Sequence, residues 1–364
     1  PIRPTVPQAI KECYDAGIRV IMITGDYHGT AQNIALEIGL KNPDKYITGD
    51  ELENLSDSQL KKKIKDVNIF VRVVPQQKLR LVNALKSNGE IVAMTGDGVN
   101  DAPALKSANI GVSMGERGTD VAREASSIVL LDDNFTSIVN GVKMGRRVFD
   151  NIRKAMSYVF SMHIPILGIT VLALIFGWPL ILLPVHILFM ELIIDPTCSI
   201  VFEAEKAEEN IMKRKPRNPK EKIFNKRTLN HSIFQGLGML LSMAALFYFT
   251  FKSTNNEYLA RAMAFSNLIF SSLLLILSSR SISKPFYKTI LEKNKAFWFV
   301  AIGALFFLAL SLYTPFFNEV FRFSTLTIKE LGISFGVALL GMLWFEIVKH
   351  THYLHYDKKR FIPK

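Results

Sequence analysis

Met94-Thr95-Gly96-Asp97-Gly98-Val99-Asn100-Asp101-Ala102-Pro103-Ala104-Leu105 follows the apolar, strand-like residues 91–93 and opens a predicted helix. Its glycines allow a tight turn in which the backbone comes close to a ligand. Asp97 and Asp101 lie at the start of that helix, where two carboxylates can share one Mg²⁺, an ion that takes oxygen ligands and usually holds phosphate oxygens as well. A simple helix cap needs only one aspartate. The stretch therefore predicts a site for Mg²⁺ and phosphate.

The chain contains three further segments that bear on this prediction. They are Pro1-Ile2-Arg3-Pro4, Met22-Ile23-Thr24-Gly25-Asp26 and Val71-Arg72-Val73-Val74-Pro75-Gln76-Gln77-Lys78. Together the four segments resemble the motifs of P-type ATPases, the cation pumps that phosphorylate one of their own aspartates. The chain resembles the carboxyl-terminal part of such a pump, of the calcium-pump-like branch that has six membrane helices after its phosphorylation domain.

The resemblance implies roles for residues that follow the first predicted strand. Thr24 would bind a phosphoryl oxygen, and Gly25 would let the backbone approach it. Asp26 is assigned to the catalytic set, where it either contacts the nucleotide or only caps the helix that starts near Gly29. Arg72 would contact the nucleotide.

The resemblance also assigns the phosphate and metal contacts. Lys78 would place a positive charge against the phosphate, where charge develops during transfer. Asp97 and Asp101 would hold Mg²⁺, and Asn100 would complete the ion and water network with Asp101. Alone, Lys78 would be read as a solvated helix lysine, but its place after Pro75 favours the catalytic role.

Strand-like and helix-like segments alternate over the first 150 residues, which predicts a parallel sheet flanked by helices. The predicted strands are residues 19–23, 69–73, 91–94, 109–112 and 128–131, and the predicted helices are 6–16, 30–38, 56–65, 76–88 and 102–107. In such sheets, ligands bind beyond the carboxyl ends of the strands. The resemblance names this an α/β haloacid-dehalogenase-like (Rossmann-like) fold. A dinucleotide site is disfavoured because no G-x-G-x-x-G follows the first strand.

The composition points to two different halves. The chain has 364 residues, a net charge of +12 and 49% hydrophobic residues, and the apolar residues concentrate after about residue 155. Many basic residues lie in short connections between apolar spans, which indicates membrane topology rather than nucleic-acid binding. Cys13 and Cys198 give no disulfide framework, as expected in a reducing cytosol. The chain begins at Pro1 with no initiator Met and no signal peptide pattern, so we expect further sequence upstream.

Six membrane spans are predicted, which gives an all-α six-helix transmembrane domain. They are residues 155–177, 180–202, 229–251, 259–279, 296–317 and 328–349. The expected domains are residues 1–134 (phosphorylation domain), 135–154 (stalk helix), 155–350 (transmembrane domain) and 351–364 (basic cytosolic tail). Basic residues of the stalk, Arg146, Arg147, Arg153 and Lys154, should meet lipid headgroups or water. The basic loops place the phosphorylation domain in the cytosol.

The second span carries two carboxylates, Glu191 and Asp195, on one predicted helix face. A carboxylate in mid-membrane costs on the order of 3 kcal/mol, which a bound cation would offset. Pro196 would free a backbone carbonyl as a further ligand. On the first span, Pro165 should unwind the helix, and His163 should either ligate the ion, pair with a carboxylate or pack as a neutral ring.

The chain departs from the two-site calcium pumps that it resembles. Those pumps carry Asn and Glu where this chain has His163 and Ile166, Asn where it has Glu191, and an acid on the fourth span where it has Ser271 and Ser272. The resemblance therefore implies one transported-ion site rather than two. Cys198 shares the face of Glu191 and is read as packing or as a soft-metal ligand. Heavy-metal pumps differ in having two spans after the catalytic core.

The phosphorylated aspartate of the family lies in a DKTGT motif that this sequence does not contain. We expect the amino-terminal half of the same pump as a partner, since it would supply that motif, the nucleotide domain and the first four helices. The expected activity is that of a P-type ATPase that exports Ca²⁺ from the cytosol, with ATP as substrate and Mg²⁺ as cofactor. It would work in the lipid bilayer of the plasma (inner) membrane, without nucleic acid.

Other functions remain open at this stage. The pump could carry Na⁺, Mn²⁺, Mg²⁺ or K⁺ instead. The chain could also be a membrane phosphatase-like enzyme without transport, although such an enzyme needs no carboxylates in the membrane. A regulatory fragment is the third possibility, which the missing nucleophile allows.

Overall fold

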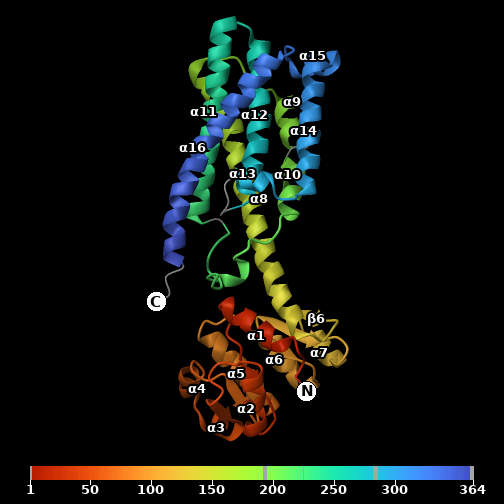
Figure 1. The fold of residues 1–364 in the computed structure, drawn as a ribbon, viewed down its shortest axis with the longest axis vertical. Helices are drawn as coiled ribbons and strands as arrows, with labels where there is room; N and C mark the ends of the chain where they lie inside the picture. The colour runs from red at the N-terminus through yellow and green to blue at the C-terminus, as the bar shows by residue number, and fades with distance from the viewer. Residues whose placement is uncertain (1, 192–194, 224, 282–285, 361–364) are drawn as a thin grey trace. The chain divides into compact units, whose positions relative to one another are not determined.

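The computed structural model describes residues 2–191, 195–223, 225–281 and 286–360, with the backbone alone at 195–198, 227, 286, 288 and 348–360. The chain forms two compact units. The first contains Pro1–Arg146 and Glu209–Glu221, and the second contains Arg147–Glu208 and Lys222–Lys364. Short strands and helices make up the first unit, and long helices make up the second (Figure 1).

The first unit holds two parallel sheets of three strands each. One has the order β1 (Met22–Ile23), β3 (Ile69–Val71), β2 (Tyr46–Thr48), and the other has the order β4 (Ala93–Gly96), β5 (Ile110–Met114), β6 (Ile128–Leu130). Ile23 pairs with Phe70 in the first sheet, and Thr95 pairs with Val112 in the second. The parallel pairing was predicted, but as a single sheet. Strand β2 was missed because only Tyr46 and Ile47 are apolar in a polar stretch of the sequence.

Helices cover these strands and close the core of the unit. They are α1 (Val6–Asp15), α2 (His28–Glu37), α3 (Gly49–Asn54), α4 (Asp57–Lys63), α5 (Pro75–Ser87), α6 (Ala102–Ser107) and α7 (Asp120–Ala125), with the 3₁₀ turns η1 (Val99–Asp101) and η3 (Ile211–Lys213). All three residues of β3 are buried, and Phe70 packs with Leu60 and Leu81. Buried strands of this kind read as unbroken apolar runs, as β3 does.

A piece of the loop after α10 belongs to the first unit. The guanidinium of Arg146 donates to the carbonyl oxygens of Ala16, Ile211 and Arg214, each at 2.8 Å. The Ile211 side chain is buried nearby. The sequence placed Arg146 among headgroups or water, and that was wrong, because three backbone carbonyls already satisfy this guanidinium.

The second unit is helical. Its elements are α8 (Phe135–Phe176, which starts in the first unit), α9 (Pro184–Phe189), α10 (Asp195–Glu203), α11 (Lys226–Thr254), α12 (Glu257–Ser279), α13 (Phe286–Ile290), α14 (Lys295–Tyr313), α15 (Pro315–Phe321) and α16 (Ile328–Arg360). Among the described residues, five helices are long and apolar enough to cross a membrane: α8, α11, α12, α14 and α16. The predicted second span, residues 180–202, includes 192–194, which lie outside the description.

Helix α8 continues through Pro165 without a break. The predicted unwinding is therefore wrong. Proline lacks an N–H, so the carbonyl of Ser161, four residues earlier, loses its helical donor. A Cβ atom on Gly236 of α11 would lie 2.6 Å from that same carbonyl oxygen. Helix α11 therefore lies directly against α8 at the point where the proline removes this hydrogen bond.

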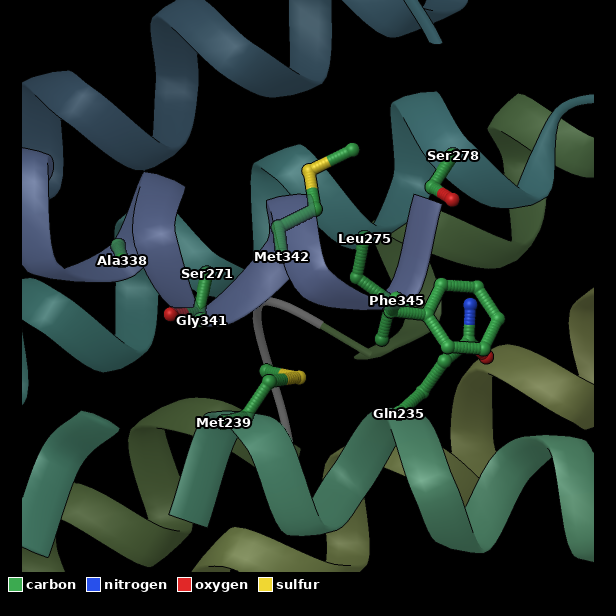
Figure 2. Close-up of a pocket in the computed structure, with 9 residues that line it drawn as sticks. All are labelled: Gln235, Met239, Ser271, Leu275, Ser278, Ala338, Gly341, Met342 and Phe345. Carbon is green, nitrogen blue, oxygen red and sulfur yellow. The ribbon is translucent and has the colours of Figure 1, made fainter. Parts of the chain in front are cut away.

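Helix α12 packs against both α11 and α16 (Figure 1). Figure 2 shows the narrow cavity that these three helices leave, with Gln235 and Met239 from α11, Ser271 from α12 and Met342 from α16 among its lining residues. The hydroxyl of Ser271 is buried and makes no hydrogen bond within the described part of the chain.

Charged side chains fasten helices of the second unit to one another. Glu205 and Arg280 form a buried ion pair at 2.8 Å, and Asn294 donates to the same carboxylate at 2.9 Å. Lys154 of α8 pairs with Glu208 at 2.9 Å. The backbone carbonyl of Glu205 accepts from α8 as well, through Arg147 and Asn151, and Arg153 donates to Thr228 of α11. The prediction that Lys154 meets headgroups or water was therefore wrong, because its side chain is buried against Glu208. Arg147 and Arg153 are half-buried and bind these oxygens.

We expect Glu205→Ala to destabilise the second unit by about 3–5 kcal/mol, because it leaves the buried Arg280 guanidinium without its counter-charge. Glu203→Ala removes an exposed carboxylate two residues away and should change stability by less than about 0.5 kcal/mol. Tryptophan fluorescence during unfolding of the detergent-purified chain measures this, since Trp178, Trp298 and Trp344 all lie in the second unit. Equal stability of the two variants would contradict the prediction.

Candidate functional site

The first group of site residues follows β1. Thr24 is joined to β3 and its extension by two backbone hydrogen bonds, from its N–H to the Phe70 carbonyl at 2.9 Å and from the Val73 N–H to its own carbonyl at 3.1 Å. Its hydroxyl accepts from the Asp26 N–H at 3.0 Å. Gly25 is exposed and has open space where a side chain would be. The turn therefore leaves room for a ligand above the end of β1.

Arg72 reaches the same turn from the end of β3. Its N–H donates to the Asp26 carbonyl at 3.3 Å, and its guanidinium lies over the Tyr27 ring, 5.4 Å from the centroid. The residue has a φ of +52°, which a non-glycine residue adopts only at a cost. Its carbonyl oxygen lies so close to Gly49 that no side chain would fit there.

Helix capping does not explain Asp26. Helix α2 begins at His28, and its N-cap is Tyr27, which makes no side-chain capping bond. The capping alternative is therefore wrong. The carboxylate of Asp26 is exposed beside Thr24 and Arg72.

The second group follows β4. A Cβ atom on Gly96 would lie 2.5 Å from the Cβ of Asp101, so only glycine allows Asp101 to fold back over the strand end. The Gly98 N–H donates to Asp101 Oδ2 at 3.3 Å. Asp101 is buried, whereas Asp97 and Asn100 are exposed. The turn thus presents one carboxylate to solvent and holds the other inside.

Lys78 is the residue that the structure brings to this turn. Helix α5 starts with Pro75 at its first position, where a missing N–H costs nothing. One turn later, Lys78 Nζ lies 2.7 Å from Asp101 Oδ1. Their side chains are 21% and 9% exposed, so the pair is partly shielded from water, and an unpaired Asp101 carboxylate there would be costly.

Gln77 of α5 is buried and was not among the predicted site residues. Its amide donates to the Gly49 carbonyl at 3.0 Å and to Glu53 at 3.1 Å, and its oxygen accepts from the Val74 N–H. It thereby fixes the start of the helix that carries Lys78. A glutamine three residues into a helix is a known capping pattern, so the signal was present in the sequence.

Asp97 is available to a metal ion. Within residues 2–146, which the structure describes, its carboxylate makes no hydrogen bond or ion pair. No three His, Cys, Asp or Glu side chains among the described residues form a complete metal cage. Mg²⁺ needs only one or two carboxylates, since water and phosphate oxygens supply the rest. The turn after β4 fits that requirement.

The membrane unit carries a second pair of predicted site residues. His163 of α8 faces Glu191, with its Nε2 atom 3.2 Å from Glu191 Oε1. Met190 and Glu191 form a π-helical turn after α9, a feature often found at functional sites. Asp195 begins α10, but its side chain and that of Cys198 lie outside the described residues, so the predicted spacing of the two carboxylates stays a prediction.

Alanine substitutions at Gly25 and Gly96 test whether one glycine has open space and the other is crowded. Gly96→Ala should destabilise the first unit by about 1–3 kcal/mol, because the new methyl group collides with Asp101. Gly25→Ala should cost less than about 1 kcal/mol, because it meets open space. Amide hydrogen exchange of peptides from residues 91–107 measures the difference. Comparable exchange in both variants would contradict the predicted crowding.

Two family models match the chain. The model for "Cation transporting ATPase, C-terminus" matches residues 179–351, and the model for "haloacid dehalogenase-like hydrolase" matches residues 1–109. The first match covers helices from α9 onward, and the second covers the turns after β1 and β4. The predicted fold class, a haloacid-dehalogenase-like domain followed by a helical transmembrane domain, is confirmed.

Curated relatives agree with the family models. Calcium-transporting ATPase 1 of Lactococcus lactis is 39% identical over 353 residues, which are 96% of this chain and 40% of that protein. The calcium-transporting ATPase of Bacillus subtilis is 36% identical over 345 residues, 93% of this chain and 38% of that protein. Calcium-transporting ATPase 1 of Saccharomyces cerevisiae is 34% identical over 336 residues, 91% of this chain and 35% of that protein.

The chain thus spans about two fifths of the length of the curated relatives that it matches. Each of these matches covers more than nine tenths of the chain. The chain belongs to the P-type cation-transporting ATPases and represents a carboxyl-terminal part of one.

Proposed function

We propose that the chain is the carboxyl-terminal part of a pump that moves a cation across a membrane by hydrolysing ATP through an aspartyl-phosphate. One observation carries this proposal. Helix α8 starts four residues after β6 of the hydrolase-like unit and runs unbroken to His163, which faces the membrane carboxylate Glu191. One continuous helix thereby connects the two kinds of site along the chain. Ca²⁺, the ion in the names of the relatives, is the reference ion.

The residues of the first unit would perform the phosphoryl transfer. Lys78, held beside Asp101, would neutralise charge on the transferred phosphate. Asp97 would ligate Mg²⁺, with Asn100 and Asp101 ordering the water around it. Mg²⁺ would supply the positive charge that bridges the phosphate and the protein.

Residues at the end of β1 would bind the other side of the phosphate and the nucleotide. The Thr24 hydroxyl and the open backbone at Gly25 suit a phosphoryl oxygen. Arg72 and Asp26 would contact ATP, since the guanidinium and Tyr27 present a cationic and aromatic surface next to the turn.

The phosphorylated aspartate would come from the amino-terminal half of the pump. Strands β1 and β4 each lie at the edge of a parallel sheet, and each ends at a catalytic turn. Edge strands carry unpaired backbone groups that can bind another strand. We propose that a strand ending in the DKTGT motif pairs there and joins the two sheets. Residues 1–134 would then complete a phosphorylation domain, with 135–154 as its stalk.

The membrane unit would hold the transported ion. His163, Glu191 and Asp195 would form the site in the transmembrane domain, residues 155–350, of the plasma (inner) membrane. The basic loops and the tail, residues 351–364, would face the cytosol. Phosphorylation would move the first unit, and α8 would transmit this motion to the site, which is a coupling between two binding events.

Phosphoenzyme formation from labelled ATP in the complete pump tests the proposal. Wild-type protein should become labelled in the presence of Mg²⁺ and a transported cation and lose the label in a chelator. Absence of labelling with every cation tested would contradict the pump and favour a non-transporting enzyme or a regulatory fragment.

We expect Asp97→Asn to lower the labelling rate about a hundredfold or more, because it removes a charged Mg²⁺ ligand. Asp50→Asn removes an exposed carboxylate at the start of α3 and serves as the matched control. It should label like the wild type. A wild-type Mg²⁺ dependence in Asp97→Asn would exclude this residue as a ligand.

We expect Asp195→Asn and Glu191→Gln to abolish activation by the transported cation, because each removes a negative charge from the site. Labelling by inorganic phosphate and Mg²⁺ should persist, since that reaction takes place at the phosphorylation site and needs no cation at Glu191 and Asp195. Cation activation that survives unchanged in both variants would move the ion site elsewhere.

A further inference from the structure

The His163 ring has a defined hydrogen-bond partner on one side. Its Nδ1 atom lies 2.8 Å from the carbonyl oxygen of Val159, one turn earlier on α8. A carbonyl oxygen only accepts hydrogen bonds, so Nδ1 must carry the hydrogen of that bond. In a neutral imidazole, the lone pair is then on Nε2. The helix itself therefore fixes both the orientation of the ring and its tautomer.

The lone pair on Nε2 faces a carboxylate. Glu191 Oε1 is 3.2 Å from Nε2, and the side chains of His163 and Glu191 are 38% and 44% exposed. With a neutral ring and an ionised carboxylate, two lone-pair atoms oppose each other with no hydrogen between them. Such an arrangement is repulsive unless a cation binds to both atoms. The pair is therefore built to share a positive charge.

The distance suits two ligands of one small ion. With a metal ion at roughly 2.1 Å from both atoms, the angle from Nε2 through the ion to Oε1 would be about 100°, which lies between the octahedral and tetrahedral values. The hydrogen bond from Nδ1 to a backbone carbonyl is also the usual support of a metal-binding histidine, because it orients the ring and makes Nε2 a better donor.

The nitrogen ligand discriminates between ions. Ca²⁺ and Mg²⁺ take oxygen ligands, whereas imidazole suits divalent ions of the first transition series. We infer that His163 and Glu191 select a divalent transition metal, of the class of Mn²⁺ or Zn²⁺, in place of Ca²⁺. This inference rests on the proposed transport function and names the ion class of that same site. Among the described residues no third His, Cys, Asp or Glu side chain joins these two.

Pulsed electron paramagnetic resonance of the untagged, detergent-purified chain loaded with Mn²⁺ tests the coordination directly. We expect hyperfine coupling from an imidazole ¹⁴N nucleus, which the oxygen ligands around Asp97 cannot give. The coupling from this site should disappear in His163→Gln, which keeps a side chain of similar length. It should persist in His231→Gln, the matched change on α11. A spectrum that is the same in His163→Gln and wild type would overturn the inference.

The complete pump tests the selectivity. Labelling from ATP should require Mn²⁺ or Zn²⁺ at lower concentrations than Ca²⁺. His163→Asn introduces the amide that the resembled calcium pumps carry at this place. It should raise the Mn²⁺ concentration required for labelling at least about tenfold, as losses around metal-binding histidines do. The difference between the required Mn²⁺ and Ca²⁺ concentrations should become smaller. His231→Asn should leave both requirements unchanged.

The alternative outcomes distinguish a failure of the inferred ion class from a failure of the proposed pump function. Labelling that needs Ca²⁺ and ignores Mn²⁺ and Zn²⁺ would overturn the metal class and keep the pump. If labelling persists in chelators and its amount changes with pH, the two side chains share a proton, and the inference of a metal ion is overturned. Loss of the ¹⁴N coupling in His163→Gln without labelling by any ion would support the metal site and contradict the pump.

Discussion

Helix α8 is the constraint on which the rest of the structure depends. It is one uninterrupted helix over residues 135–176, yet its first turns belong to the hydrolase-like unit and its later turns to an apolar bundle. A proline in the interior of such a helix removes a hydrogen bond and normally bends it. Tight packing against Gly236 offsets that tendency. The chain therefore passes from the first unit to the second as one continuous run of helix.

The charged residues of the two units form ion pairs of different kinds. In the first unit, Lys78 and Asp101 stay partly accessible at a strand end, where a phosphate and Mg²⁺ can approach. In the second unit, the Glu205 and Arg280 side chains are almost completely buried, and the Asn294 amide and the Thr289 carbonyl make further hydrogen bonds to them. A buried pair of this kind holds helices in register, because breaking it leaves an uncompensated charge.

His163 and Glu191 fit neither pattern. They are about as exposed as surface residues, and their facing atoms are both lone-pair donors when the ring is neutral. A positive charge between the two atoms, from a bound cation or from a proton on the ring, removes that repulsion. The arrangement is therefore understandable as an ion site, and the imidazole nitrogen decides which class of ion it favours.

The sequence by itself determined the two-part architecture, the parallel strands and the place of the candidate-site turns at strand ends, because these follow from apolar runs, glycines and carboxylates that are local along the chain. Gly96 and Asp97 were placed correctly at a strand end for that reason. Only the tertiary structure decided the partner of each charge. Arg146 could not be assigned to three carbonyls, nor Glu205 to Arg280, because these contacts join residues 65 to 130 positions apart and 75 positions apart, respectively. Nor could the pattern of residues 155–177 reveal that Pro165 stays helical, since the support comes from another helix.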